Sequence, residues 1–172
     1  HLQLNRVSEL NEATRQQIIT ADDVAHKEKL VHWLLANESY QKAVIFTNTR
    51  AQADRLYGHL VASDIKVFVL HGEKDQKERK LAIERLKQGG VKVLVATDVA
   101  GRGIHVDGIS HVINFTLPED PDDYVHRIGR TGRAGTSGTS ISFAGEDDAF
   151  ALPPIEALIG RKIQCEMPPD EI

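Results

Sequence analysis

The chain has 172 residues, of which 41% are hydrophobic and 27% are charged, and its formal net charge is −4. This length suits one domain with a hydrophobic core, and the composition excludes collagen-like, coiled-coil and wholly disordered proteins. The single cysteine, Cys165, excludes an intramolecular disulfide framework and a cysteine-based zinc site.

Residues 1–14 are polar and lack a clear period, so we expect a linker or flexible lead-in there, followed by one domain at residues 15–172. In that domain, short apolar runs rich in β-branched residues alternate with amphipathic stretches. Near-continuous apolar runs fit strands buried on both faces of a parallel sheet. Strands are predicted at 43–47, 66–70, 92–96, 111–115 and 139–143, with weaker candidates at 16–20 and 162–166.

Helices are predicted between these strands. Apolar residues recur at helical spacing within 30–34, 56–61 and 82–86, and Gly89 predicts a left-handed cap on the third helix. Strand alternating with helix implies right-handed crossovers. We therefore predict an α/β fold, an open, doubly wound, mostly parallel sheet with helices on both faces. Such sheets bind ligands beyond the carboxyl ends of their strands.

The segment YVHRIGRTGRAG (124–135) is the strongest functional candidate. Arg127, Arg130 and Arg133 recur every three residues and alternate with glycines. Cations at this spacing repel one another by a few tenths of a kcal/mol per pair, and each glycine costs a helix roughly 1 kcal/mol. The pattern is therefore consistent with an anion such as phosphate in front of it, or with a solvent-exposed basic loop.

Two further segments follow predicted strands. In ATDVAGRGI (96–104), Thr97 and Asp98 stand where a strand ends, and either side chain could simply cap the next turn. The glycines around Arg102 allow close approach to a sugar–phosphate chain. In HGEKDQKERK (71–80), neighbouring lysines add a positive helix face, which also fits an ordinary solvated helix.

Other chemistries lack a sequence pattern. The eight histidines show no metal-ligand spacing, so no metal site is predicted. The chain has no G-x-x-x-x-G-K-[ST] phosphate loop, because AGTSGTS (134–140) lacks the lysine. The net charge argues against a nucleic-acid partner, yet residues 66–105 carry nine basic and five acidic side chains. We therefore expect a polarised surface.

Four segments together resemble the carboxyl-terminal motifs of the DEAD-box ATP-dependent RNA helicases. These are VIFTNTR (44–50), HGEKDQKER (71–79), VLVATDVAGRGIHV (93–106) and YVHRIGRTGRAG (124–135). They match the family's fourth motif, its Gln-x-x-Arg element, and its fifth and sixth motifs in order and spacing. The resemblance implies the second RecA-like domain of an RNA helicase, without the phosphate loop, Asp-Glu-Ala-Asp box and Q motif of the first domain.

The resemblance also implies an ATP site. ATP with Mg²⁺ is expected to bind mainly to the absent amino-terminal domain, so this chain alone should be inactive and hold no tightly bound cofactor. Arg130 and Arg133 are implied as arginine fingers that face the γ-phosphate, and Gly103 and His105 as further nucleotide contacts. Where this chain has His105, the family usually has an Asp that reaches the nucleotide ribose. A neutral imidazole could still hydrogen-bond a ribose hydroxyl.

Contacts with RNA and with the other domain are implied as well. His126, Arg127 and Gly129 are expected to join interdomain contacts that couple ATP to RNA. Backbone contact without base reading implies weak sequence preference. The residues implied to contact the RNA backbone are Asn48, Thr49, Arg50, Gly72, Gln76, Arg79, Thr97, Asp98 and Arg102.

The histidine at position 105 and the runs 117–135 and 150–160 are similar to the RhlB-type bacterial helicases, which associate with RNase E in the RNA degradosome. RNA, the amino-terminal domain and RNase E are therefore the expected partners, with no membrane partner and a cytoplasmic location. Two alternatives remain: a DNA-directed helicase of the same superfamily, and a free-standing RNA or protein-docking module without enzymatic activity.

Overall fold

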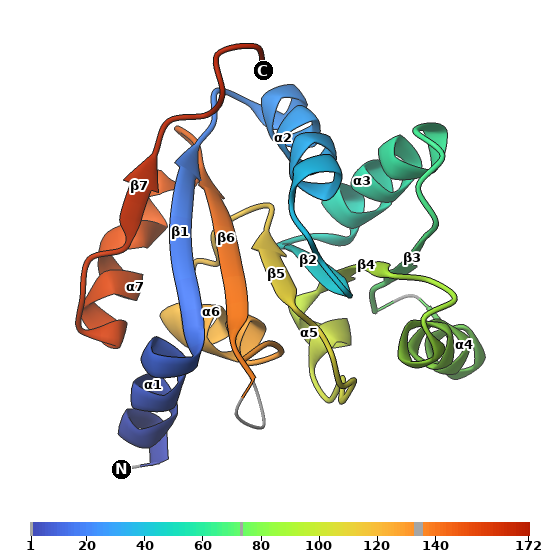
Figure 1. Ribbon diagram of the computed structural model, residues 1–172, viewed down its shortest axis with the longest axis horizontal. Helices are drawn as coiled ribbons and strands as arrows, with labels where there is room; N and C mark the ends of the chain where they lie inside the picture. The colour runs from blue at the N-terminus through green and yellow to red at the C-terminus, as the bar shows by residue number, and fades with distance from the viewer. Residues whose placement is uncertain (1, 73, 133–135) are drawn as a thin grey trace.

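A computed structural model of the chain describes residues 2–72, 74–132 and 136–172. In this part of the chain, seven strands form one parallel sheet in the order β3-β4-β2-β5-β6-β1-β7 (Figure 1). The predicted open, doubly wound α/β fold is confirmed. The strands are β1 (Thr14–Thr20), β2 (Ala43–Thr47), β3 (Val67–Leu70), β4 (Val93–Thr97), β5 (His111–Asn114), β6 (Gly138–Ala144) and β7 (Gln164–Glu166).

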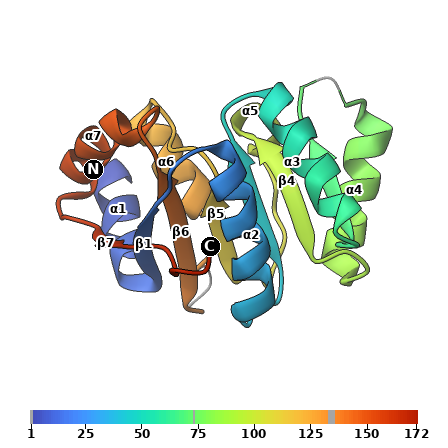
Figure 2. The same ribbon diagram turned by 90° about the horizontal axis from the view of Figure 1, so that it is seen from above.

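Helices cover both faces of the sheet (Figure 2). On one face, α2 (Val24–Asn37) and α3 (Arg50–Ala62) bury leucines against the strands. On the other face, a second core cluster joins the remaining helices to the sheet. These are α1 (Leu2–Ala13), α4 (Gln76–Gln88), α5 (Asp98–Gly101), α6 (Pro121–Ile128) and α7 (Leu152–Ile159), the last preceded by the 3₁₀ helix η1 (Ala149–Ala151).

The predicted strands are all present, each within two residues of its predicted bounds. The central strands β2, β4 and β5 are buried along their whole length, which explains their continuous apolar runs. The three predicted helices correspond to α2, α3 and α4. Gly89 caps α4 with a φ of 80°, as predicted.

The segment expected to be a flexible lead-in differs in the structure, where residues 2–13 form α1. Val7 and Leu10, which are three residues apart, are each 7% exposed and join the core beside α6 and α7. Asn11 Nδ2 also donates to Ile159 O at 3.0 Å. Two buried side chains among those described in α1 are too few to produce a helical period in the sequence. That the segment links to a preceding domain stays a prediction.

The close approach of α5 to β2 gives the first testable prediction. A Cβ on Gly101 would lie 2.5 Å from Phe46 Cε1, and Phe46 is a core side chain only 2% exposed. Gly101→Ala should therefore destabilise the domain by about 1–3 kcal/mol. The matched control is Gly58→Ala, because Gly58 is exposed within α3 and a Cβ there meets nothing within 4 Å.

Urea unfolding of the two variants measures the difference. Gly58→Ala should stabilise the domain by about 0.5–1 kcal/mol, since alanine favours the helix over glycine. Equal effects of the two substitutions would show that α5 does not pack on Phe46 as described.

Candidate functional site

A buried arginine joins the carboxyl ends of the central strands. Arg127 in α6 is 1% exposed, and its Nε and Nη2 donate to Asp98 Oδ1 and Oδ2 at 2.6 and 2.7 Å. Nη2 also donates to Asn48 Oδ1 at 2.6 Å. Nη1 donates to Asn114 Oδ1 at 3.3 Å and to Thr116 O at 2.8 Å. These five hydrogen bonds use all five N–H donors of the guanidinium.

This arrangement ties α6 to three strands at once. Asp98 follows β4, Asn48 follows β2, and Asn114 ends β5. The guanidinium carbon of Arg127 also lies 5.4 Å from the centre of the Phe46 ring. Because Arg127 is directed into its own domain, an interdomain role for this residue stays a prediction that would act through Asn48 and Asp98.

The sequence explains why α6 presents Arg127 inward. Asp120 caps the helix by accepting the amide of Asp122, and Pro121 occupies the first turn. Tyr124, which is 1% exposed, donates its hydroxyl to Gln16 Oε1 at 2.8 Å. Burial raises the pKa of Tyr124, so the hydroxyl stays protonated as a donor. The buried side of this short helix therefore combines Tyr124 with Arg127.

The turn after β4 is held from α4. Arg79 donates through Nη1 to Ala100 O and through Nη2 to Arg102 O, the second at 2.9 Å. Gly103 follows with a φ of 76°, a conformation that favours glycine. The side chain of Arg102 is exposed, and its Nη2 lies 3.6 Å from Asp123 Oδ1. Arg79 thus braces the loop that presents Arg102.

The pKa of the Asp123 carboxyl is raised above its ordinary value. Burial, followed by the neighbouring carboxylates of Asp98 and Asp120, raises the pKa of Asp123, while Arg102 and Arg127 lower it. The carboxyl of Asp123 therefore keeps its proton to a higher pH than an ordinary aspartate does.

Next to Arg127, a cavity of about 250 Å³ opens at the carboxyl edge of the sheet. Arg130 borders it, and its Nη1 donates to Ile104 O at 2.7 Å. His126 is exposed on the same side of α6. The cavity is lined by Phe46, Asp98, Gly101, Arg102, Gly103, Asp123, His126, Arg127 and Arg130.

A larger cavity of about 760 Å³ lies between α1 and α6. It shares His126 and Arg130 with the smaller cavity, but Glu9 and Glu12 of α1 also line it. Its two carboxylates face one arginine among the described residues, whereas the smaller cavity sets three arginines, Arg102, Arg127 and Arg130, against Asp98 and Asp123. The smaller cavity is therefore the better candidate for an anion.

Several predicted residues lie at the same edge as the cavity. Thr49 caps α3 by accepting the amide of Gln52, and Arg50, which begins that helix, is exposed. Gly72 and Gln76 are exposed before and at the start of α4. Thr97 is 7% exposed and precedes α5 without a side-chain capping bond.

The remaining predicted residues are placed as follows. His105 is exposed just after Ile104, and Gly129 is the C-cap of α6. Arg133 lies outside the described residues. Within the described ranges there is no group of three or more His, Cys, Asp or Glu side chains that could hold a metal ion. No helix in this part of the chain is long and apolar enough to cross a membrane.

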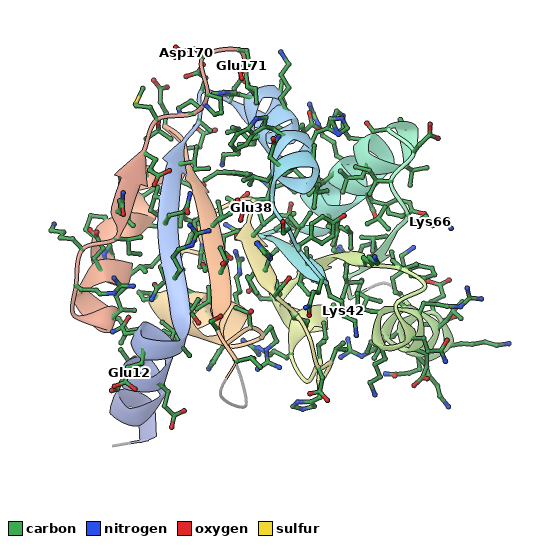
Figure 3. The ribbon with its side chains drawn as sticks, in the orientation of Figure 1. Glu12, Glu38, Lys42, Lys66, Asp170 and Glu171 are labelled. Atoms are coloured by element: carbon green, nitrogen blue, oxygen red, sulfur yellow. The ribbon has the colours of Figure 1, made fainter. Side chains whose placement is uncertain are left out.

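The charged side chains labelled in Figure 3 come from different parts of the fold. Lys42 and Lys66 lie on the side of the molecule that carries α4, whereas Glu12 lies on α1 at the opposite side (Figure 3). Asp170 and Glu171 belong to the carboxyl-terminal segment, away from α4 (Figure 3). A polarised surface around residues 66–105 stays a prediction.

The sequence analysis missed three partners of the buried arginine: Phe46, Asn114 and Thr116. Asn114 offered a clue, because its amide follows two apolar residues of the predicted strand 111–115 and must find a partner when buried. Thr116 contributes only its carbonyl, which no side-chain pattern reveals.

Comparison with known proteins gives a consistent result. The model of the helicase conserved C-terminal domain matches residues 25–135. The ATP-dependent RNA helicase RhlB of Pseudomonas aeruginosa (strain UCBPP-PA14) is 57% identical over 159 residues, which cover 92% of this chain and 40% of that protein. RhlB of Vibrio atlanticus is 51% identical over 80% of this chain and 32% of its own length. The chain thus spans about 40% or less of these relatives.

Solved structures agree with this result. The E. coli DEAD-box protein SrmB, bound to regulator of ribonuclease activity A, superposes with a TM-score of 0.86 and 40% identity over 92% of both chains. S. cerevisiae Dbp5 bound to RNA and ADP BeF3 gives a TM-score of 0.83 and 33% identity over 90% of this chain and 41% of that one.

Removal of the buried guanidinium gives the second prediction. Arg127→Met leaves Asp98 without its charge partner and several acceptors unsatisfied, so it should destabilise the domain by about 3–5 kcal/mol in urea unfolding. Arg102→Met is the control, because that arginine is 66% exposed and its change should stay within about 0.5 kcal/mol. A loss below 1 kcal/mol for Arg127→Met would contradict its role as a structural centre.

Proposed function

The chain belongs to the DEAD-box RNA helicases as a helicase C-terminal domain, and on that premise we propose that it forms the carboxyl-terminal half of an ATP-dependent enzyme that unwinds RNA. In this proposal, the domain binds the RNA sugar–phosphate backbone and supplies arginine side chains to ATP held in a cleft with an amino-terminal domain. The main support is the cavity of about 250 Å³ that gathers Arg102, His126 and Arg130 at the carboxyl edge of the sheet.

The residues of this cavity fit a nucleotide phosphate. Guanidinium groups pair well with phosphate oxygens, and an arginine aimed at a transferring phosphoryl group accelerates its transfer by about 10³–10⁵. Arg130 has this role in the proposal, because it borders the cavity and its hydrogen bond to Ile104 O fixes its direction. Arg133 is proposed as a second finger on the family resemblance alone. Gly103 offers backbone without a side chain beside His105, the proposed ribose contact.

Mg²⁺ is assigned to the other domain. ATP supplies its own phosphate ligands to the ion, and carboxylates at a strand end usually complete the site. The carboxylates in this cavity are Asp98, which already accepts two hydrogen bonds from Arg127, and Asp123, which lies near Arg102. We therefore propose that the side chains described here contact the phosphates and leave the metal to the amino-terminal domain.

The RNA surface in this proposal runs along the carboxyl edge. Arg50, Gln76 and Arg102 are exposed there and could approach phosphates, whereas Arg79 acts by holding the loop around Arg102. Contacts to the backbone bind RNA with little sequence preference. Closure of the two domains on one bent strand would exclude its base-paired partner, and hydrolysis would release it.

The wider role follows from the relatives. Because RhlB of Pseudomonas aeruginosa is 57% identical over 92% of this chain, we extend the proposal to RNA decay in the cytoplasm, with RNase E as a partner in a degradosome. Nothing in the arrangement of the cavity depends on this extension.

The third prediction concerns Arg130 in the full-length parent. Arg130→Ala should lower RNA-stimulated ATP hydrolysis by about 10³-fold or more, because positive charge at the γ-phosphate is lost in the transition state. Steady-state phosphate release measures the rate, and circular dichroism checks the fold. Lys162→Ala, on a side chain 92% exposed at another part of the domain, is the control.

Wild-type turnover in Arg130→Ala would remove the catalytic role of this residue. The 172-residue chain without its partner domain should show no ATP hydrolysis above background. Turnover by the pure chain would contradict the proposal that ATP hydrolysis needs the amino-terminal domain.

The fourth prediction tests the ribose contact of His105. His105→Asp should tighten nucleotide binding about tenfold, since a carboxylate accepts a hydrogen bond from a ribose hydroxyl more strongly than an imidazole does. Isothermal titration calorimetry of the full-length parent with ADP measures the dissociation constant. His105→Asn provides a neutral control, and an unchanged constant in His105→Asp would exclude a ribose role at this position.

A further inference from the structure

A buried ion pair lies outside the cavity described above. Lys27 of α2 and Asp148, which follows β6, are joined by a contact of 2.9 Å between Nζ and Oδ2. The two side chains are only 8% and 5% exposed. Lys27 Nζ also lies 5.8 Å from the centre of the Phe115 ring. The pair has no part in the nucleotide or RNA contacts proposed so far.

Asp148 does more than neutralise Lys27. Its Oδ2 accepts the backbone amide of Leu117 at 3.0 Å, and its Oδ1 accepts the amide of Gly145 at 2.7 Å. Leu117 belongs to the segment between β5 and α6. The carbonyl of this same residue accepts Asn48 Nδ2 at 3.1 Å.

The segment 116–117 is therefore held from both sides. Asp148 holds the amide of Leu117, while Arg127 and Asn48 hold the carbonyls of Thr116 and Leu117. Asn48 in turn accepts a hydrogen bond from Arg127 at 2.6 Å. A continuous set of polar contacts thus runs from the ion pair to the buried guanidinium.

We propose that Asp148 is a positioning residue that fixes Leu117, and through it the geometry of Asn48 and Arg127 at the functional edge. This inference rests on the proposed helicase function for its activity readout. A buried ion pair by itself adds little stability, because apolar residues of similar volume often replace it without loss. An apolar residue at position 148 cannot, however, accept the amide of Leu117.

Two double variants separate positioning from stability. Lys27→Met/Asp148→Leu removes the charges and the acceptors for the amides of both Leu117 and Gly145. Lys27→Met/Asp148→Asn removes the same charges but keeps one side-chain oxygen, which can accept the amide of Leu117 while the amide of Gly145 loses its acceptor. If Asp148 acts only through stability, the activity of each variant should fall in step with its unfolding midpoint. If Asp148 positions Leu117, the variant that keeps an oxygen at position 148 should keep its activity and the Leu variant should lose it.

In the full-length parent, the Leu variant should lose at least tenfold in kcat for RNA-stimulated ATP hydrolysis, with KM for ATP changed less than twofold. The Asn variant should retain kcat within about threefold of wild type. Wild-type kcat in a folded Leu variant overturns the proposal. If the Leu variant does not fold, the Asn variant still decides, because a tenfold loss there overturns the proposal as well.

A second arm uses the 172-residue chain and does not depend on catalysis. Solvent exchange of the Arg127 Nε proton, followed by NMR, should be at least tenfold faster in the Leu variant than in the Asn variant, and equal rates would overturn the proposal. If the wild-type parent shows no RNA-stimulated hydrolysis, the proposed function fails while this arm still tests the positioning.

The control is a polar contact at the amino ends of the strands. Glu38 follows α2 and accepts from His111 Nε2 at 3.0 Å, so Glu38→Gln disturbs a partly buried pair away from Leu117. Both kcat and Arg127 exchange should remain at wild-type values in Glu38→Gln, and a loss equal to that of the Leu variant would overturn the specific role of Asp148.

Discussion

The arrangement of the carboxyl edge depends on one buried guanidinium. A charged group as large as that of Arg127 is tolerated in the interior only when each of its donors is paired, because an unpaired buried charge costs several kcal/mol. The five acceptors come from Asn48, Asp98, Asn114 and Thr116, which belong to the ends of three neighbouring strands. Satisfying Arg127 therefore fixes the relative positions of these strand ends.

This constraint changes the interpretation of the segment 124–135. The repulsion among its arginines is consistent with an external anion in front of the whole group or with a solvent-exposed basic loop. The structure instead compensates Arg127 internally with Asp98 and directs Arg130 to the border of the cavity. One arginine thus serves the architecture of the domain, and the argument for an anion applies to Arg130 and to the exposed Arg102.

The periodic parts of the fold could be predicted from the sequence, because burial on two faces of a strand or along one stripe of a helix leaves a regular apolar pattern. α1 left too few buried residues to give a period, and α6 and α7 are short helices that begin at or beside prolines. The site could be predicted as a set of residue types at the strand ends. Its centre could not, since arginine is rarely buried and Thr116 contributes through a carbonyl.

The same contacts bear on how RNA and ATP could be coupled. Asn48 and Asp98 face Arg127 on one side and belong, on the other, to the loops proposed to meet RNA. Arg130 follows Arg127 by three residues and borders the cavity proposed for phosphate. With each donor of Arg127 already engaged, movement of one loop alone would break charged hydrogen bonds. The loops proposed to meet RNA are therefore joined, through Arg127 and its helix, to the residue proposed to meet phosphate.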